Sequence, residues 1–347
     1  MIVDANLYWV PEALFTDQAL RERFLRPISD DTSVSGYYGY LHTNSNGQQE
    51  FAFEKPRGCQ NLNYIQGEYH TEVQLRDMDA AGVDKAVLKT PCCQEWLDLN
   101  MCRIFNDGMA SQVRESGGRL AALAVIPPFF TPEVEKELDR CLNELGMHGI
   151  QLSAHYQGKY LDDPVFSPLF EALETRHLTA YVHHTPLPVQ YDALLDYTSL
   201  RRSYGRCVDQ TTAVCRELYS NMFEKYPHVK LVHSMLGGGF FAIAPMMMPH
   251  GASSGDKSGR FSNANGNVAQ QLRENIYFEM SHAQPWGKAQ LECAVKVLGA
   301  DHIVFGSSYP VKQEWLLGGP EFVRSLDISD QDKALILGGN AQRLYHL

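Results

Sequence analysis

The sequence contains no Cys-x-x-Cys pair, although eight of its 347 residues are cysteine. Such pairs are typical of structural zinc sites and of redox centres, so neither class is indicated. Only Cys92 and Cys93 are adjacent, and neighbouring cysteines do not easily bridge each other. We therefore expect free thiols and a reducing, cytoplasmic location. The eight positions are Cys59, Cys92, Cys93, Cys102, Cys141, Cys207, Cys215 and Cys293.

Long apolar runs and runs of lysine and arginine are also missing. No apolar stretch approaches the roughly 18 residues that a membrane-spanning helix needs. The formal net charge is −11, which argues against nucleic acid or an anionic membrane as the main partner. The opening residues, MIVDAN, are typical of a strand rather than of a signal peptide. A small molecule is the expected partner, and a local arginine could still bind an anionic one.

Short apolar runs alternate with segments of helical spacing along the whole chain. Hydrophobic residues make up 44% and charged residues 20%, enough to build a large core. Eight strands that alternate with helices predict a parallel (β/α)8 barrel, a TIM barrel, formed by residues 1–347 as a single domain. The predicted strands are 1–9, 83–91, 119–128, 147–155, 178–186, 228–239, 274–282 and 301–310.

Two segments interrupt this alternation. Residues 28–70 are rich in Tyr, Gly, Asn and Gln and follow the first predicted strand, and residues 245–273 follow the sixth. Both leave from the carboxyl ends of strands, where the active sites of such barrels lie. We expect inserted loops that serve as lids or as arms of a homodimer, and the composition does not distinguish these roles.

Five phrases, in the right order, resemble the amidohydrolase superfamily, in particular its amidohydrolase-2 branch. The resemblance implies a (β/α)8 barrel related to aminocarboxymuconate semialdehyde decarboxylase, and it favours a homodimer, since relatives are commonly dimers. The phrases are RDMDAAGVDKAVL (76–88), YLDDPVFSPLFEALETRHLTAYVHHTP (160–186), MFEKYPHVKLVHSMLGGGFF (222–241), VFGSSYP (304–310) and ILGGNAQRLYHL (336–347).

The resemblance does not extend to the metal ligands of that branch. Asn6 and Tyr8 stand where the branch has the two histidines of its D-x-H-x-H opening. His183 is kept on the fifth strand, whereas Met235 and Ser308 replace the usual histidine and aspartate of the sixth and eighth strands. Amide, phenol and hydroxyl groups are poor ligands for zinc and similar ions. We therefore predict no metal cofactor, with one divalent ion such as zinc at a relocated site as the alternative.

Catalysis is predicted to rest on histidine. His183 lies at the catalytic depth that the resemblance implies, and we expect it to act in acid/base chemistry as the proton donor. His233 lies two residues before Met235 and shares its side of the strand, so it is a second catalytic candidate. Tyr8 is the third, because a phenol can hydrogen-bond a developing negative charge. His184 should face away from the barrel.

The same strand ends are expected to supply substrate contacts. Asn6 and Ser308 would replace a metal-binding site with neutral hydrogen-bonding groups that contact the substrate. Met235 would form part of an apolar pocket wall. Lys89 could bind a carboxylate or act as a base with a lowered pKa. Arg57, on the first inserted segment, could bind a carboxylate with two hydrogen bonds. The remaining predicted contacts, from the ends of the fourth and seventh strands, are His155, Glu279 and His282.

These residues favour a metal-independent, lyase-type enzyme. Without a Lewis acid, chemistry that needs only proton placement is the most accessible, such as decarboxylation, hydration, dehydration or cyclisation. The expected substrate is a small cyclic or aromatic molecule with carboxylate or phenol groups. Two alternatives are a metal-dependent hydrolase or decarboxylase with a relocated ion, and a catalytically silent barrel that only binds a ligand.

Overall fold

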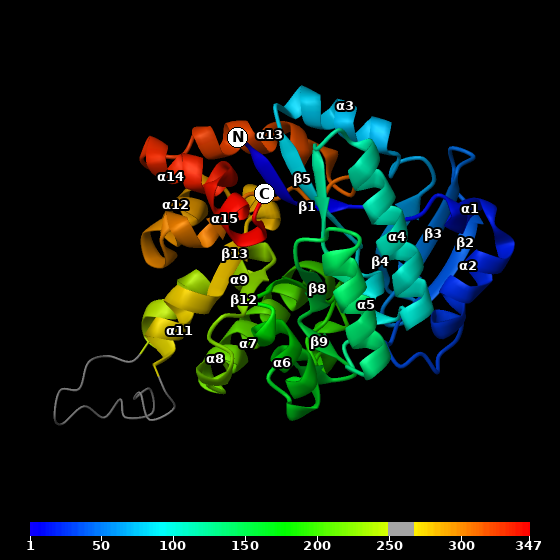
Figure 1. Cartoon of the computed structure of the whole chain (residues 1–347), viewed down its shortest axis with the longest axis horizontal. Helices are drawn as coiled ribbons and strands as arrows, with labels where there is room; N and C mark the ends of the chain where they lie inside the picture. Colours follow the sequence, from blue (N-terminus) through cyan, green and yellow to red (C-terminus); the bar gives the residue numbers. More distant parts are fainter. Residues whose placement is uncertain (249–266) are drawn as a thin grey trace.

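Parallel strands in chain order surround the centre of the computed structural model, which describes residues 1–248 and 267–347 (Figure 1). The strands pair in the orders β1-β5-β6 and β7-β8-β11-β12-β13-β14, and all of these pairings are parallel. They are β1 (Val3–Tyr8), β5 (Lys85–Lys89), β6 (Leu120–Ala122), β7 (Ala124–Val125), β8 (Ile150–Ser153), β11 (Thr179–His183), β12 (Lys230–His233), β13 (Ile276–Glu279) and β14 (Ile303–Val304).

The two groups of strands close into one barrel. Only Leu123 separates β6 from β7, so these two short strands occupy a single barrel position. At the other seam, the Ala5 amide donates to Phe305 O at 2.9 Å and the Tyr8 amide donates to Tyr309 O at 2.8 Å. The predicted (β/α)8 barrel is therefore confirmed, with each of its eight strand positions inside the predicted range.

The strands are buried on both faces. Side chains that point inward form a small apolar cluster, including Val3, Val87, Leu123 and Tyr181, which the carboxyl-terminal Tyr345 closes from below. Outward side chains such as Leu7 join the much larger cluster beneath the helices. Near-continuous apolar runs are the sequence signature of such two-sided burial.

Helices cover the outside of the barrel (Figure 1). Each longer helix places one apolar stripe against the strands, as amphipathic spacing requires. The helices are α1 (Ala13–Thr16), α2 (Gln18–Leu25), α3 (Thr71–Ala81), α4 (Leu99–Glu115), α5 (Pro132–Asn143), α6 (Ser167–Thr175), α7 (Gly205–Tyr219), α8 (Met222–Lys225), α9 (Met235–Gly239), α10 (Ala244–Met247), α11 (Val268–Asn275), α12 (Lys288–Leu298), α13 (Gln313–Arg324), α14 (Asp330–Ala334) and α15 (Asn340–Tyr345).

The first inserted segment forms a three-stranded antiparallel sheet, with strand order β2-β3-β4. In Figure 1 this sheet lies beside α1 and α2 at one end of the molecule. Phe51 and Phe53 of the central strand pack against Phe24 of α2, and Phe53 also packs against Trp96. The segment is thus a folded extension fixed to the barrel by aromatic side chains. Its strands are β2 (Tyr38–Thr43), β3 (Gln49–Glu54) and β4 (Gln60–Ile65), and a separate hairpin joins β9 (His155–Tyr156) to β10 (Lys159–Tyr160).

The second predicted loop, 245–273, begins within α10 and ends within α11. Its central part, 249–266, lies outside the described residues. No helix in the two described parts of the chain combines the length and the apolar character needed to cross a bilayer.

Candidate active site

A small cavity of about 90 Å³ opens at the carboxyl ends of the barrel strands, and we call it the inner cavity. Tyr8 reaches it from β1 and His183 from β11, while Cys92, His282 and Ser308 reach it from the segments that follow β5, β13 and β14. This is the end of a (β/α)8 barrel at which active sites form. The inner cavity is therefore the candidate active site.

His183 and Tyr8 form a hydrogen-bonded pair in this cavity. The phenol oxygen of Tyr8 lies 2.9 Å from His183 Nε2, and His183 Nδ1 lies 2.7 Å from the carbonyl oxygen of His184. A carbonyl oxygen only accepts, so Nδ1 carries the imidazole proton and Nε2 accepts from Tyr8. His184 also lines the cavity, so the expectation that it faces away was wrong.

Burial keeps both members of the pair neutral. It lowers the pKa of His183 to about 3, with a smaller contribution from the Lys89 ammonium, and it raises the pKa of the Tyr8 phenol. An imidazole with so low a pKa is not protonated at rest near neutral pH. At rest, Nε2 of His183 therefore carries no proton and can accept one from Tyr8.

A hydrogen-bonded network of Ser308, Asn6 and Glu279 lies beside and below this pair. Ser308 lines the cavity, and its backbone has a φ of 59°, a left-handed conformation that is uncommon for serine. Asn6 Nδ2 donates to Ser308 Oγ at 3.0 Å and to Glu279 Oε2 at 3.1 Å. Asn6 and Glu279 are almost fully buried beneath the cavity and do not line it. Asn6 and Glu279 therefore support Ser308 from below, and the structure corrects the prediction that they contact the substrate directly.

Lys89 is also buried beneath the cavity. Its ammonium donates to Ala5 O at 3.0 Å and lies 3.5 Å from the centre of the Tyr181 ring. Burial lowers the pKa of Lys89 to about 7, against the opposing effect of the nearby Glu279 and Asp4 carboxylates. The side chain is fully buried and does not line the cavity, so the structure does not place it where it could bind a substrate carboxylate as predicted.

His233 is a buried core residue and is not part of the cavity. Its Nδ1 lies 2.8 Å from Gln210 Oε1 and its Nε2 lies 2.7 Å from Glu217 Oε2. Both of its nitrogens are therefore engaged by α7. Val232, the preceding residue, belongs to the inward apolar cluster, so His233 faces α7 outside the barrel interior. The predicted inward direction that His233 was to share with Met235 is therefore wrong, and of the two only Met235 lines a cavity. The structure thus corrects the prediction that His233 joins the catalytic group.

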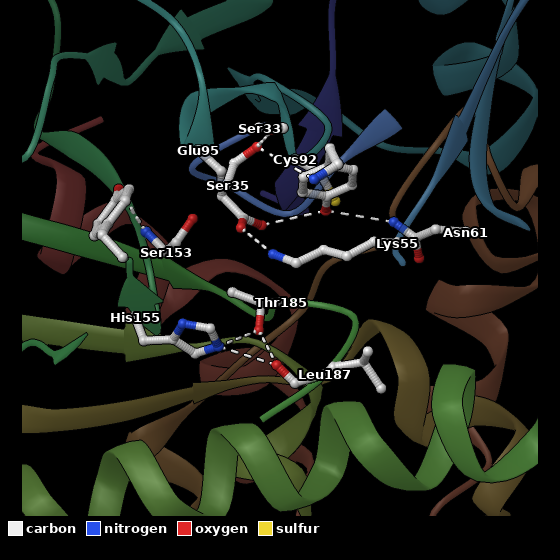
Figure 2. Close-up of polar contacts among 12 residues, drawn as sticks. Ser33, Ser35, Lys55, Asn61, Cys92, Glu95, Ser153, His155, Thr185 and Leu187 are labelled. Carbon is white, nitrogen blue, oxygen red and sulfur yellow. Dashed lines mark hydrogen bonds and ion pairs between the residues drawn. The ribbon is translucent and has the colours of Figure 1, made fainter. Parts of the chain in front are cut away.

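Two further predicted contacts lie elsewhere. His155 Nε2 lies 2.7 Å from Thr185 Oγ1 and 3.0 Å from Leu187 O, away from the inner cavity (Figure 2). Arg57 is on the surface, where it pairs with Asp31 at 3.2 Å and stacks on Tyr38. Both residues have local polar partners, although His155 Nδ1 makes no hydrogen bond with the described residues, and sequence position alone does not reveal such partners.

A larger cavity of about 450 Å³ adjoins the first, and we call it the outer cavity. Met235 lines it, and His282 lines both cavities. The His282 ring packs edge-on against Trp315, with 4.7 Å between ring centres, and its Nδ1 lies 3.0 Å from Ser281 Oγ. These two predicted contacts therefore lie where a small molecule could touch them.

Sequence reasoning missed several residues of the site. Three cationic side chains, Arg202, Arg206 and Lys312, line both cavities, and Asn61 of the inserted sheet lines the inner one. The two arginines belong to the segment between the fifth and sixth barrel strands, which had no predicted element before residue 211. Their spacing of four residues, which places them on one helical face, was the available signal. The other missed lining residues include Leu62, Cys92, Trp286, Val311 and Trp315.

Comparison with known proteins identifies the family. A family model described as amidohydrolase matches residues 60–347. The chain belongs to this amidohydrolase family. The amidohydrolase chain is 27% identical over 278 residues to a 2-amino-3-carboxymuconate-6-semialdehyde decarboxylase of Dictyostelium discoideum, a match that covers 78% of this chain and 75% of the relative.

Solved structures share the fold of this amidohydrolase. A 5-carboxyvanillate decarboxylase from Sphingomonas paucimobilis matches with a TM-score of 0.78 and 21% identity over 100% of this chain and 99% of the other. A dihydroxybenzoic acid decarboxylase from Polaromonas matches with a TM-score of 0.71 and 19% identity over 100% and 97% of the chains, and it holds manganese and the inhibitor 2-nitroresorcinol.

The side chains at the inner cavity of this amidohydrolase do not fit such an ion. Nε2 of His183 is engaged by the Tyr8 phenol, and Ser308 and Asn6 offer neutral oxygen and nitrogen atoms. Across residues 1–248 and 267–347, no three His, Cys, Asp or Glu side chains are grouped so that they could hold a metal ion. Manganese requires several such ligands, carboxylates above all.

Proposed function

We propose that this amidohydrolase is a decarboxylase that removes CO2 from a small aromatic or cyclic carboxylate with an adjacent hydroxyl group, without a metal ion. The observation that carries the proposal is the neutral His183–Tyr8 pair at the base of a cavity whose mouth is lined by cations. The relatives that are named as decarboxylases of carboxylated rings and muconates support the same reaction class.

The pair suits a reaction that begins by removing a proton. The substrate hydroxyl gives its proton to the Tyr8 oxygen as Tyr8 passes its own proton to His183 Nε2, so the phenol stays neutral. The substrate is now a phenolate, and its negative charge increases the electron density on the ring carbon that bears the carboxylate. The imidazolium then returns the proton, through Tyr8, to this carbon. This relay requires a histidine that is unprotonated at rest, as the lowered pKa of His183 provides.

Loss of CO2 completes the reaction. The C–C bond to the carboxylate breaks, its electron pair restores the aromatic ring, and the product phenolate takes a proton from water. Ser308 and His282, which line the cavity, are placed to donate hydrogen bonds to the developing negative charge on the substrate oxygen. Cys92 acts as a neutral wall, because burial raises the pKa of its thiol to about 12.

The experiment that tests this proposal is CO2 release from a panel of ortho-hydroxy aromatic carboxylates by the purified protein. Tyr8→Phe and His183→Gln are expected to lower kcat by about 10²- to 10⁴-fold. His346→Asn is the matched control, because His346 is exposed and has the left-handed backbone that asparagine tolerates. Unchanged kcat in the Tyr8 and His183 variants would contradict the relay.

A metal titration decides between this proposal and its alternatives. Activity should persist after dialysis against a chelator and should not rise on addition of Mn²⁺ or Zn²⁺. Activity that disappears with chelation and returns with Mn²⁺ would instead establish a metal-dependent decarboxylase with a relocated ion. Saturable binding of panel members without any turnover would indicate a barrel that only binds its ligand.

A further inference from the structure

The mouth of the inner cavity is cationic although the chain as a whole is acidic. Arg202, Arg206 and Lys312 line both cavities, and none of the described residues that line either cavity is Asp or Glu. The formal net charge of the chain is −11, so this concentration of positive charge is local. A site lined in this way favours a ligand with more than one negative charge.

We infer that the substrate carries a second acidic group that survives the reaction, and that Arg202, Arg206 and Lys312 bind it while Asn61 aligns the two arginines. This inference rests on the proposed decarboxylation and specifies its substrate class as an aromatic or cyclic dicarboxylate. The outer cavity, which the same cations line, is the place for the retained group.

Asn61 connects the inserted sheet to the two arginines. Arg206 Nη2 donates to Asn61 Oδ1 at 2.6 Å, and Arg202 Nη2 donates to the Asn61 carbonyl oxygen at 2.9 Å. The side chain of Asn61 is held in turn, because its Nδ2 donates to the phenol oxygen of Tyr37 at 3.4 Å. One residue of β4 thus fixes two guanidinium groups of the neighbouring segment.

The support for Asn61 continues into the barrel. Tyr37 donates to Glu95 Oε1 at 3.2 Å, and Lys55 of the inserted segment pairs with Glu95 Oε2 at 2.7 Å. Figure 2 shows Asn61, Lys55 and Glu95 converging around this contact. The Lys55 and Glu95 side chains are only 11% and 4% exposed, so the pair is well shielded from solvent. The arginines are consequently aligned before any ligand binds.

Arg206 still has donors to offer. Its Nε is buried and makes no hydrogen bond with the residues that the structure describes. A guanidinium has five N–H donors in a planar fork that matches the two oxygens of a carboxylate. A buried donor without a partner is costly, and an anionic ligand would satisfy it.

The cations suit a retained carboxylate better than the one that leaves. A carboxylate loses its charge as it becomes CO2, so cations beside it would stabilise the ground state more than the transition state and slow the reaction. Among the described residues, the base of the inner cavity has no cationic lining residue that would stabilise the ground state in this way. It is lined by Tyr8, neutral His183, Cys92 and Ser308. The reacting group therefore belongs at the neutral base and the retained group at the cationic mouth.

The test is calorimetric binding of two unreactive compounds, benzoate and benzene-1,3-dicarboxylate. We expect the dicarboxylate to bind wild-type protein about 10- to 100-fold more tightly than benzoate, as a charge-assisted hydrogen bond predicts. Arg206→Gln should abolish this difference, and Asn61→Leu should weaken dicarboxylate binding by a larger factor than benzoate binding. Lys312→Gln, at an exposed position, is a second variant that should reduce the difference without any risk to folding.

The matched control is Arg201→Gln. Arg201 is adjacent to Arg202, but its guanidinium donates to Leu195 O and Thr198 Oγ1, and it lines neither cavity. This variant removes the same charge and should retain the wild-type preference. Equal binding of the two compounds, or a preference that survives both Arg206→Gln and Lys312→Gln, would overturn the inference.

Turnover separates this inference from the proposed function. In kinetic assays with hydroxylated mono- and dicarboxylates, Asn61→Leu should raise KM for the dicarboxylate by a larger factor than it lowers kcat, since Asn61 aligns the arginines. Decarboxylation of monocarboxylates as efficient as that of dicarboxylates would refute the second acidic group and leave the decarboxylase intact. Preferential dicarboxylate binding without CO2 release would refute the decarboxylase and leave the anion site.

Discussion

Acidification should destabilise the folded protein through His183, because burial holds this imidazole neutral. Its pKa is about 3 in the folded protein, against 6.5 for an ordinary histidine in the unfolded chain. Between these two values the unfolded state binds a proton that the folded state does not. The stability is therefore fully present above pH ~6.5 and is lost as the pH falls toward ~3.

The size of the loss follows from the same numbers. Each pH unit within this window lowers the free energy of unfolding by about 1.4 kcal/mol for one such group. Moving from pH ~7.5 to ~5 crosses about 1.5 units of the window, so His183 alone should contribute a loss of about 2 kcal/mol. The pKa values of His184 and His282 are lowered by burial as well, and they add losses of the same sign.

The assay is urea-induced unfolding at the two pH values, for wild-type protein and for His183→Gln. The variant will have its own stability, so the readout is the difference between the two pH responses, expected to be about 2 kcal/mol smaller in the variant. The exposed His346→Asn variant should respond as the wild type does. If His183→Gln loses as much stability on acidification as the wild type, His183 is not held neutral by burial and the relay loses its resting base.

Three further outcomes are expected. Glu217→Ala should lower the free energy of unfolding by about 3 kcal/mol in chemical denaturation, because the buried His233 loses a partner and a cavity opens, while kcat per folded molecule stays unchanged. Gly306→Ala should destabilise by about 1–3 kcal/mol or prevent folding, because a Cβ there would lie 2.2 Å from Glu279 Oε1; a wild-type melting temperature would contradict this. Cys92 should resist thiol-reactive reagents at mildly alkaline pH in the native protein, since burial raises its pKa to about 12, and mass spectrometry that finds it labelled as fast as in urea would refute this.

Whether a residue at a strand end lies in the cavity could be predicted only where the geometry of its own strand sets the direction of its side chain. His183 lies at the end of β11, and the alternation of side chains that groups it with the inward Tyr181 was enough to bring it to the cavity. Tyr8 reaches the cavity because the register of β1 shifts between Asp4 and Leu7, so that both Val3 and Tyr8 face inward. On β12 the inward residue is Val232, so His233 faces α7 and is bonded there by Gln210 and Glu217. Which buried histidine meets a helix and which meets a cavity depends on packing between elements.

The cationic mouth was beyond prediction for a different reason. Asn61 lies more than 140 positions from Arg202 and Arg206, and only the folded inserted sheet brings it to them. The composition of residues 28–70 suggested a lid or an arm, and it contained no signal for which strand edge would face the barrel. Long-range contacts of this kind have no local sequence pattern.

The sequence by itself determined the barrel and the neutral character of Asn6, Tyr8 and Ser308. Apolar runs that alternate with helices are typical of a parallel sheet buried on both faces, and eight of them fit a closed barrel. The identities of Asn6, Tyr8 and Ser308 fix the chemistry of their own side chains wherever they lie. The tertiary structure alone decided which polar groups share the cavity and in which protonation state. The directions of side chains at the strand ends depend on turns such as the left-handed one at Ser308. The neutrality of His183 depends on burial by residues that are distant in the sequence. A local stretch of chain determines neither property.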